Sequence, residues 1–435
     1  MPAQLRIGAA RRDITPEPGS ELAGFIARLK PSVDVADSLH ARVSIVRRNQ
    51  NAIAIVQADL LGFSPWHVAE VRDFAWRRLS IPRDGVLLSA THTHSGPGVV
   101  HVRGCGVAPY VYQRAMVEQI QGALEEAQSK LLPAQMELGS LPYCLGINRR
   151  QETPTGVVLG FAPEKPHPEI LTVARLETPQ QNVLLFSHAC HPYVLGGESL
   201  LISGDYPSLA SAELEKDPGT VALFLNGCAG NIAPRSAFQG IEKAREEGAR
   251  LAAAVREGCS RMQVFQDTTL RLASALVHLP YEPLPDEEGT DAILAQKERV
   301  VRPDEKTNPE IQERIRSALE EWRELMGKII RGRAPLAPVH CEVQAVRVGP
   351  LTLLGISGEP FFEIGEEIRA ASRLHTLWPL GYTNAYCGYI PTRDEYPRGG
   401  YEVNDSWKYV GVWKIDSTCE ERVVQAATEV LSYIV

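Results

Sequence analysis

Short apolar runs alternate with helical patterns through the first half of the chain. The runs typical of strands are 41–48, 52–60, 86–90, 171–176, 182–187 and 221–225. Apolar residues at helical spacing predict helices at 66–79, 110–129, 207–216 and 240–257. Such alternation is typical of α/β proteins, in which helices pack on the faces of sheets. We therefore expect a mixed β-sheet core flanked by helices.

Residues 284–335 depart from this pattern, because they are rich in charge and nearly free of aromatic side chains. The stretch PEIQERIRSALEEWRELMGKII places Ile, Leu, Trp and Met on one side of a helix. We expect a charged helical insertion or lid within a single domain that spans 1–435; a connector between two halves of the sheet is the alternative. Strands at 340–347 and 351–357 and a closing helix at 417–432 then return to the core.

Composition narrows the class of protein. The 435 residues are 44% hydrophobic and 23% charged, as in ordinary globular proteins, and the net charge of −8 does not favour a nucleic-acid partner. No apolar run reaches the length of a membrane span, and the N-terminus lacks a signal-peptide core. The eight cysteines include no CxxC pair, so we expect reduced thiols and a cytoplasmic location.

The first candidate for chemistry is ATHTHSGPG at 90–98, directly after the apolar run GVLLS. In an extended segment, residues i and i+2 point to the same side, so His92 and His94 can face one cavity. Imidazole is the commonest zinc ligand. A pair of structural hydrogen-bonding histidines is the alternative.

A second histidine cluster lies in FSHACHPYVLGGESLLISGDYPS at 186–208. His188 and His191 end another apolar strand, and Asp205 precedes a helix that it could cap. Active sites of α/β proteins form where strand ends meet at one edge of the sheet. Two clusters at strand ends therefore favour a site over isolated core histidines.

Three further segments carry weaker signals. The turn NGCAGN at 226–231 could expose backbone N–H groups to an oxyanion, and Glu359 lies between an apolar strand and a helix. Residues 381–402 hold five tyrosines. Taken singly, these features also fit an ordinary strand-to-helix turn, a partner for a helix dipole, and packing residues.

Together these segments resemble the neutral/alkaline, non-lysosomal ceramidase family. The matching features, in family order, are THTHSGPG, a strand-ending His-Pro followed by ISGD, a glycine-bearing turn before Ala-Pro, a Gly-Glu segment, and a Tyr-rich run ending in Tyr-Glu. They extend over 91–402, and the family's C-terminal immunoglobulin-like domain is expected to be missing. The resemblance implies a hydrolase that cleaves an amide (N-acyl) bond.

The resemblance also implies a catalytic Zn²⁺ and a set of site residues. Carried over by motif, the metal ligands are His92, His191, Glu359 and Tyr389, with Tyr386 as the alternative for the fourth position. By the same resemblance, the groups that act on the scissile bond are His94, Arg149 and Tyr401. A metal-bound hydroxide would attack the amide carbonyl.

One position departs from the family pattern: Ala233 stands where the family has a serine, and Asn231 where it has an aspartate. The substrate is therefore expected to be a small-molecule or lipid N-acyl compound that is smaller and more polar than ceramide. A zinc esterase or lactonase on the same scaffold, and a non-catalytic metal-binding relative, are the alternatives. The sequence does not define the oligomeric state.

Overall fold

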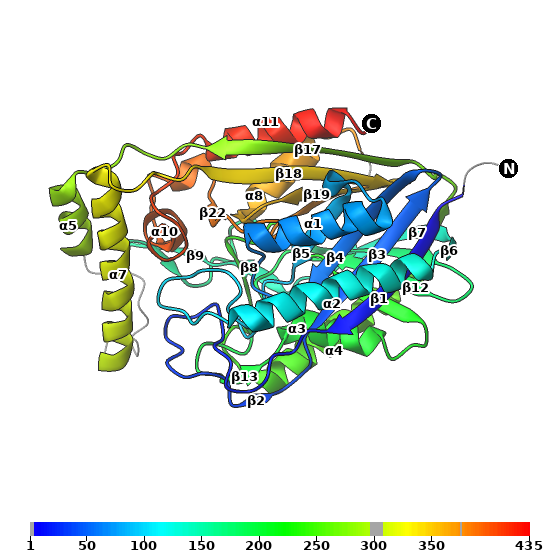
Figure 1. Cartoon of the computed structure of the whole chain (residues 1–435), viewed down its shortest axis with the longest axis horizontal. Helices are drawn as coiled ribbons and strands as arrows, with labels where there is room; N and C mark the ends of the chain where they lie inside the picture. Colours follow the sequence, from blue (N-terminus) through cyan, green and yellow to red (C-terminus); the bar gives the residue numbers. More distant parts are fainter. Residues whose placement is uncertain (1–3, 296–307, 375) are drawn as a thin grey trace.

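Three β-sheets surround a shared apolar core, and helices cover their outer faces (Figure 1). The computed structural model describes residues 4–295, 308–374 and 376–435. The mixed sheets with flanking helices confirm the predicted α/β class.

The first sheet has the strand order β5-β4-β3-β1-β6. Its strands are β1 (Arg6–Asp13), β3 (His40–Arg48), β4 (Asn51–Ala58), β5 (Val86–Ala90) and β6 (Leu132–Pro133). Strands β4 and β5 run parallel, and the other neighbours are antiparallel. Helix α2 (Tyr110–Ser129) packs on β1 and β3, with α1 (Pro65–Leu79) beside it.

The second sheet has the order β14-β12-β11-β7-β16. Its strands are β7 (Gln135–Pro142), β11 (Ile170–Glu177), β12 (Asn182–Ser187), β14 (Thr220–Phe224) and β16 (Gln263–Phe265). Only β12 and β14 are a parallel pair. Helices α3 (Asp205–Leu214) and α4 (Ile241–Cys259) pack together on this sheet.

The third sheet has the order β17-β18-β19-β21. Its strands are β17 (Leu270–Leu279), β18 (Val339–Val348), β19 (Leu351–Ile356) and β21 (Thr376–Leu380), of which β19 and β21 are parallel. Helices α8 (Phe362–Ala371) and α11 (Cys419–Ser432) cover it.

Alternate residues of each strand face the central core and the helices. Along β4, Ile53 and Ile55 belong to the core between the sheets, whereas Ala54 and Val56 pack with the helices. Because both faces are buried, the strands appear in the sequence as nearly continuous apolar runs. That is why the sequence located the central strands correctly.

Strands with weaker patterns were missing from the prediction. Strand β1 carries Arg11, Arg12 and Asp13, and β17 is an edge strand with several partly exposed positions. The apolar run of β1 is short because the strand is buried only over residues 7–10, and that of β17 is interrupted because exposed and partly buried residues alternate along it.

The segment between β17 and β18 contains α5 (Glu287–Ala295) and α7 (Pro309–Ile330), which stand at one end of the molecule (Figure 1). Helix α7 has the bounds predicted from its amphipathic pattern, whereas residues 296–307 of the expected insertion lie outside the described residues. Trp322 of α7 is buried, and its indole Nε1 donates to the Val412 carbonyl at 2.7 Å. Its ring lies against Trp407 of α10 (Ser406–Val410), next to α9 (Tyr401–Asn404).

Four short ribbons complete the fold. They are β2 (Asp34–Val35) with β13 (Leu201–Ile202), β8 (Gly146–Asn148) with β15 (Ile232–Pro234), β9 (Arg150–Thr153) with β10 (Gly156–Leu159), and β20 (Glu359–Pro360) with β22 (Tyr389–Ile390). Among the described residues, no helix combines the length and the apolar character needed to cross a bilayer.

Candidate metal centre

Strand ends from all three sheets converge at one place in the fold. His92 follows β5, His191 follows β12, and Glu359 follows β19. Isolated β-bridges join the neighbouring loops, from Ser89 to Thr383 and from Gly227 to Leu380. The three ligand candidates are at most 1% exposed, so the site is enclosed by the protein.

The orientation of His92 is set by its backbone conformation and by contacts of its ring with a carbonyl and an aromatic side chain. Its φ of +70° lies in the left-handed region, which non-glycine residues rarely adopt and which often marks functional sites. The segment is therefore a turn and not the extended stretch expected from the His-x-His spacing. Its Nδ1 lies 2.7 Å from the Leu61 carbonyl, and the Tyr382 ring stacks on the imidazole at 4.1 Å.

His191 is fixed in the same manner by the loop after β14. Its Nδ1 lies 2.7 Å from the carbonyl of Ala229 and 3.1 Å from that of Ile232. Burial, and then the charge of Arg149, lower the pKa of His191 to about 4, so the imidazole is neutral at neutral pH. With the Nδ1–H given to a carbonyl, the lone pair is on Nε2.

Glu359 faces both of these imidazoles. Its Oε2 lies 3.2 Å from His92 Nε2 and 3.1 Å from His191 Nε2. Its Oε1 accepts a hydrogen bond from the Tyr386 hydroxyl at 2.6 Å. None of the three converging atoms has a hydrogen-bond partner within the described residues.

This arrangement fits a divalent metal ion. Two imidazole lone pairs directed at a carboxylate oxygen repel one another unless a cation lies between them. Ligand atoms in a tetrahedral zinc site, each about 2.0–2.1 Å from the metal, are about 3.3 Å apart, close to the separations of His92 and His191 from Glu359. A metal-binding histidine usually donates the N–H of its other ring nitrogen to a carboxylate, a backbone carbonyl or water, and the carbonyls beside the Nδ1 atoms can accept these hydrogen bonds.

His94 lies beside this group. Potential ligand atoms of His92, His94 and His191 are all within 4.8 Å of one another. Both ring nitrogens of His94 are buried without a hydrogen-bond partner in the part of the chain that the structure describes. Burial, followed by the neighbouring imidazoles, lowers the pKa of His94 well below its usual value. The ring is thus a neutral base that can take up a proton or bind a metal.

The other predicted site residues line the opposite side. Tyr389 pairs with Glu359 in the ribbon of β20 and β22, and its hydroxyl accepts a hydrogen bond from Arg149 Nη2 at 3.0 Å. The Tyr401 ring lies 5.9 Å from that of Tyr389. Burial raises the pKa of the Tyr401 phenol, so it remains a hydrogen-bond donor at neutral pH. All seven residues named from the sequence thus lie in one neighbourhood.

The structure adds residues that the sequence analysis did not single out. Glu402 accepts from Arg149 Nε at 2.9 Å and from Arg150 Nη1 at 2.5 Å, which holds Arg149 in place. The Tyr193 ring lies 5.3 Å from that of His94. Glu402 is the glutamate of the Tyr-Glu motif that closes the Tyr-rich run, although no role was assigned to it from the sequence. Tyr193 lies two residues after His191, and that proximity was its only signal in the sequence.

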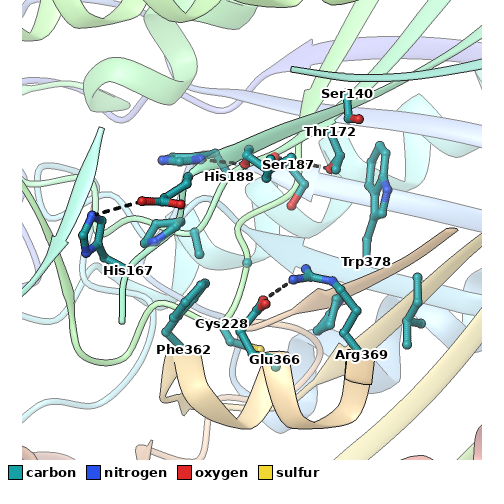
Figure 2. A pocket seen from close by; sticks show the side chains of 18 of the residues that line it. Ser140, His167, Thr172, Ser187, His188, Cys228, Phe362, Glu366, Arg369 and Trp378 are labelled. Atoms are coloured by element: carbon teal, nitrogen blue, oxygen red, sulfur yellow. Dashed lines mark hydrogen bonds and ion pairs between the residues drawn. The ribbon is translucent and has the colours of Figure 1, made fainter. Parts of the chain in front are cut away.

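His188 belongs to a different environment. Its Nδ1 lies 3.0 Å from the Ile170 carbonyl, and its Nε2 accepts from the Leu145 N–H at 3.3 Å, so both nitrogens are paired. It lines a cavity of about 1090 Å³ together with Cys228, Phe362 and other residues, and the lining of this cavity does not include His92, His191 or Glu359 (Figure 2). His188 is a core histidine with its hydrogen bonds satisfied.

One local interpretation from the sequence is wrong, and the structure narrows a second. Asp205 is the first residue of α3 and not its N-cap, which is Gly204; its carboxylate instead accepts from the Leu195 N–H at 3.1 Å. The turn at 226–231 does not offer its Gly230 N–H to an oxyanion, because that group donates to the Pro360 carbonyl at 2.9 Å. The turn also contributes the Ala229 carbonyl to His191.

Known proteins resemble this chain over nearly its whole length. No family model matches it. A neutral ceramidase of Mycobacterium tuberculosis is 23% identical over 94% of this chain and 75% of its own length, and one of Pseudomonas aeruginosa is 27% identical over 92% and 70%. The crystal structure of the Pseudomonas aeruginosa neutral ceramidase aligns with a TM-score of 0.73 at 20% identity, covering 100% of this chain and 75% of that one. A ceramidase complexed with C2 gives 0.72 at 20% identity, over 99% and 76%.

Proposed function

We propose that this chain, a member of the neutral ceramidase family by sequence and fold, is a zinc-dependent hydrolase of an N-acyl amide bond. The observation that carries the proposal is that the unpaired Nε2 atoms of His92 and His191 lie 3.2 and 3.1 Å from the unpaired Oε2 of Glu359. The names of the relatives support amide hydrolysis of ceramide-like substrates.

In this proposal, His92, His191 and Glu359 hold the metal with Tyr389 as the fourth ligand. Tyr386 was the alternative, but its hydroxyl already donates to Glu359 Oε1, the oxygen that does not face the imidazoles. A donor to a ligating carboxylate orients that ligand, which favours an outer role for Tyr386. Tyr389 has a hydroxyl that accepts from Arg149, so its remaining lone pair is free to bind a cation.

The remaining residues act on the amide. When bound, Zn²⁺ polarises a carbonyl and acidifies water. His94 takes a proton on its unpaired ring nitrogen and passes it to the leaving amine. Arg149, fixed by Glu402, and the protonated Tyr401 phenol donate hydrogen bonds to the oxygen on which negative charge develops.

A panel of substrates tests this function. N-acyl amides of increasing acyl length, and the matching esters, would be incubated with metal-loaded protein and with protein treated with a chelator. We expect metal-dependent release of the amine. Cleavage of the esters alone would establish the esterase alternative, and no cleavage of either series would favour a non-catalytic relative.

Aromatic rings limit the space over His94. The Phe25 and Tyr193 rings lie 5.0 and 5.3 Å from that of His94, and Tyr193 stacks on Phe238 at 5.2 Å. Tyr193 is 7% exposed, whereas Phe238 is 45% exposed, so the rings lead from the surface to the site. Because these rings occupy the space beside His94, they favour a substrate with a compact acyl group.

Tyr193→Ala is therefore expected to shift the preference towards longer acyl chains. The ratio of kcat/KM for a long-chain over a short-chain amide should rise about 10-fold or more, since pocket contacts discriminate by that order per methylene. Tyr193→Phe, which keeps the ring, should leave the ratio unchanged. An equal ratio in wild type and Tyr193→Ala would remove this residue from the acyl pocket.

A second prediction concerns the serine that this chain lacks. Ala233 is buried in β15, so no acyl-enzyme can form at that position. Ser236 is buried with no partner among the described residues, whereas Ser203 donates to Asp37, a possible base that the sequence did not reveal. We expect a linear release of amine without a burst in rapid-mixing experiments. An acyl adduct on Ser236 or Ser203, detected by mass spectrometry, would contradict direct hydrolysis.

A further inference from the structure

We infer that Asn226 is a positioning residue of the metal centre, whose single amide group joins the two strand ends that carry His92 and His191. The inference rests on the proposed metal site and adds a residue that does not touch the metal. Asn226 lies two residues after β14 ends at Phe224 and is fully buried.

The contacts of the amide connect both histidine loops. Its Nδ2 donates to the Thr91 carbonyl and to the Cys190 carbonyl, both at 3.1 Å. Its Oδ1 accepts from the Cys190 N–H at 3.2 Å. Thr91 precedes His92 and Cys190 precedes His191, so one side chain holds the residue before each of the two histidines.

The backbone around Asn226 extends this link to the third sheet. Its carbonyl accepts from the Gly381 N–H at 3.2 Å, and Tyr382 in turn donates its N–H to the Gly358 carbonyl at 2.8 Å. Gly358 precedes Glu359. The loop that supplies the third ligand candidate is therefore connected to the same point, where the ends of β5, β12, β14 and β21 meet.

An asparagine suits this position because two donors and one acceptor are needed on one short side chain. Aspartate would direct a second oxygen at two carbonyls, and alanine would remove the Asn226 partner of the Thr91 carbonyl, the Cys190 carbonyl and the Cys190 N–H. The Cys190 carbonyl also accepts from the Tyr206 hydroxyl at 2.8 Å, so its loop has a second support. The specific contribution of Asn226 is the spacing between the two loops.

Metal binding depends closely on that spacing. Sites lose function when ligands move by about 1 Å, and loss of an outer hydrogen bond commonly costs 10–100-fold in metal affinity. Asn226→Ala should therefore weaken Zn²⁺ binding by about 10–100-fold. The visible spectrum of the Co²⁺-substituted protein should change as well, because it reports ligand geometry.

A buried amide elsewhere provides the matched control. Gln344 is fully buried, and its Nε2 donates to the carbonyls of Asp84 at 2.7 Å and Val86 at 3.3 Å, at the start of β5, whereas His92 follows the other end of that strand. Gln344→Ala removes the same number of donors to backbone carbonyls. We expect it to lower the melting temperature while keeping wild-type metal affinity and the wild-type Co²⁺ spectrum.

The measurements are the dissociation constants for Zn²⁺ and Co²⁺, the Co²⁺ spectrum, and the melting temperature of the metal-free protein. If Asn226→Ala does not fold, Asn226→Ser, which retains one donor and one acceptor, should fold and show an intermediate affinity. A folded Asn226 variant with wild-type affinity and spectrum would overturn the inference. A wild-type protein that binds neither metal would instead overturn the proposed metal centre.

Discussion

His191→Ala is expected to lose both the bound metal and all measurable amide hydrolysis. His191 Nε2 lies 3.1 Å from Glu359 Oε2, and its Nδ1 is already committed to the Ala229 carbonyl, so Nε2 is the atom available to a metal. Alanine at this position removes one of the two imidazole ligands and leaves His92, Glu359 and Tyr389. Elemental analysis of the purified variant and turnover on an N-acyl amide would measure the effect.

His188→Ala is the control for this experiment, because His188 lies three residues away on the same strand end and is equally buried. Its two hydrogen bonds are structural, so its loss should cost about 1–3 kcal/mol of unfolding free energy but leave the metal content unchanged. A fully metal-loaded His191→Ala protein, or a metal-free His188→Ala protein, would show that the ligand assignment is wrong.

Tyr401→Phe is expected to retain the metal and to lower kcat by roughly 100-fold, the effect of removing one donor to a developing oxyanion. The hydroxyl is the only group removed, and the ring that packs near Tyr389 remains in place. The neighbouring Glu402 continues to hold Arg149. Steady-state kinetics at saturating substrate, combined with elemental analysis, would separate a catalytic effect from loss of metal.

Tyr396→Phe is the matched control in the same segment. Its hydroxyl donates to the Asp416 carbonyl at 3.0 Å and contributes to local packing. This variant should keep both kcat and the metal. If Tyr401→Phe matches it in turnover, Tyr401 has no part in stabilising the oxyanion.

The sequence by itself determined the secondary structure where the pattern was strong. Helices at 110–129 and 309–330 and strands at 86–90 and 182–187 have the predicted bounds, and the other central strands differ by one or two residues at an end. A strand that is buried on both faces forms a continuous apolar run, and a helix that is buried along one stripe has apolar residues at helical spacing. Both patterns can be recognised within the segment itself, without knowledge of its tertiary contacts. The histidine motifs also indicate the resemblance to the neutral ceramidase family, because they can be recognised without the fold.

Only the tertiary structure decided which atoms face one another. Thr91, Cys190 and Asn226 meet although 135 and 36 residues separate the first two from Asn226. No local period encodes such contacts, because they arise where loops of two sheets pack at their strand ends. The same holds for His188 and His191, whose different roles cannot be inferred from their spacing. In the fold, His188 is hydrogen-bonded to backbone groups of the core, whereas His191 faces Glu359.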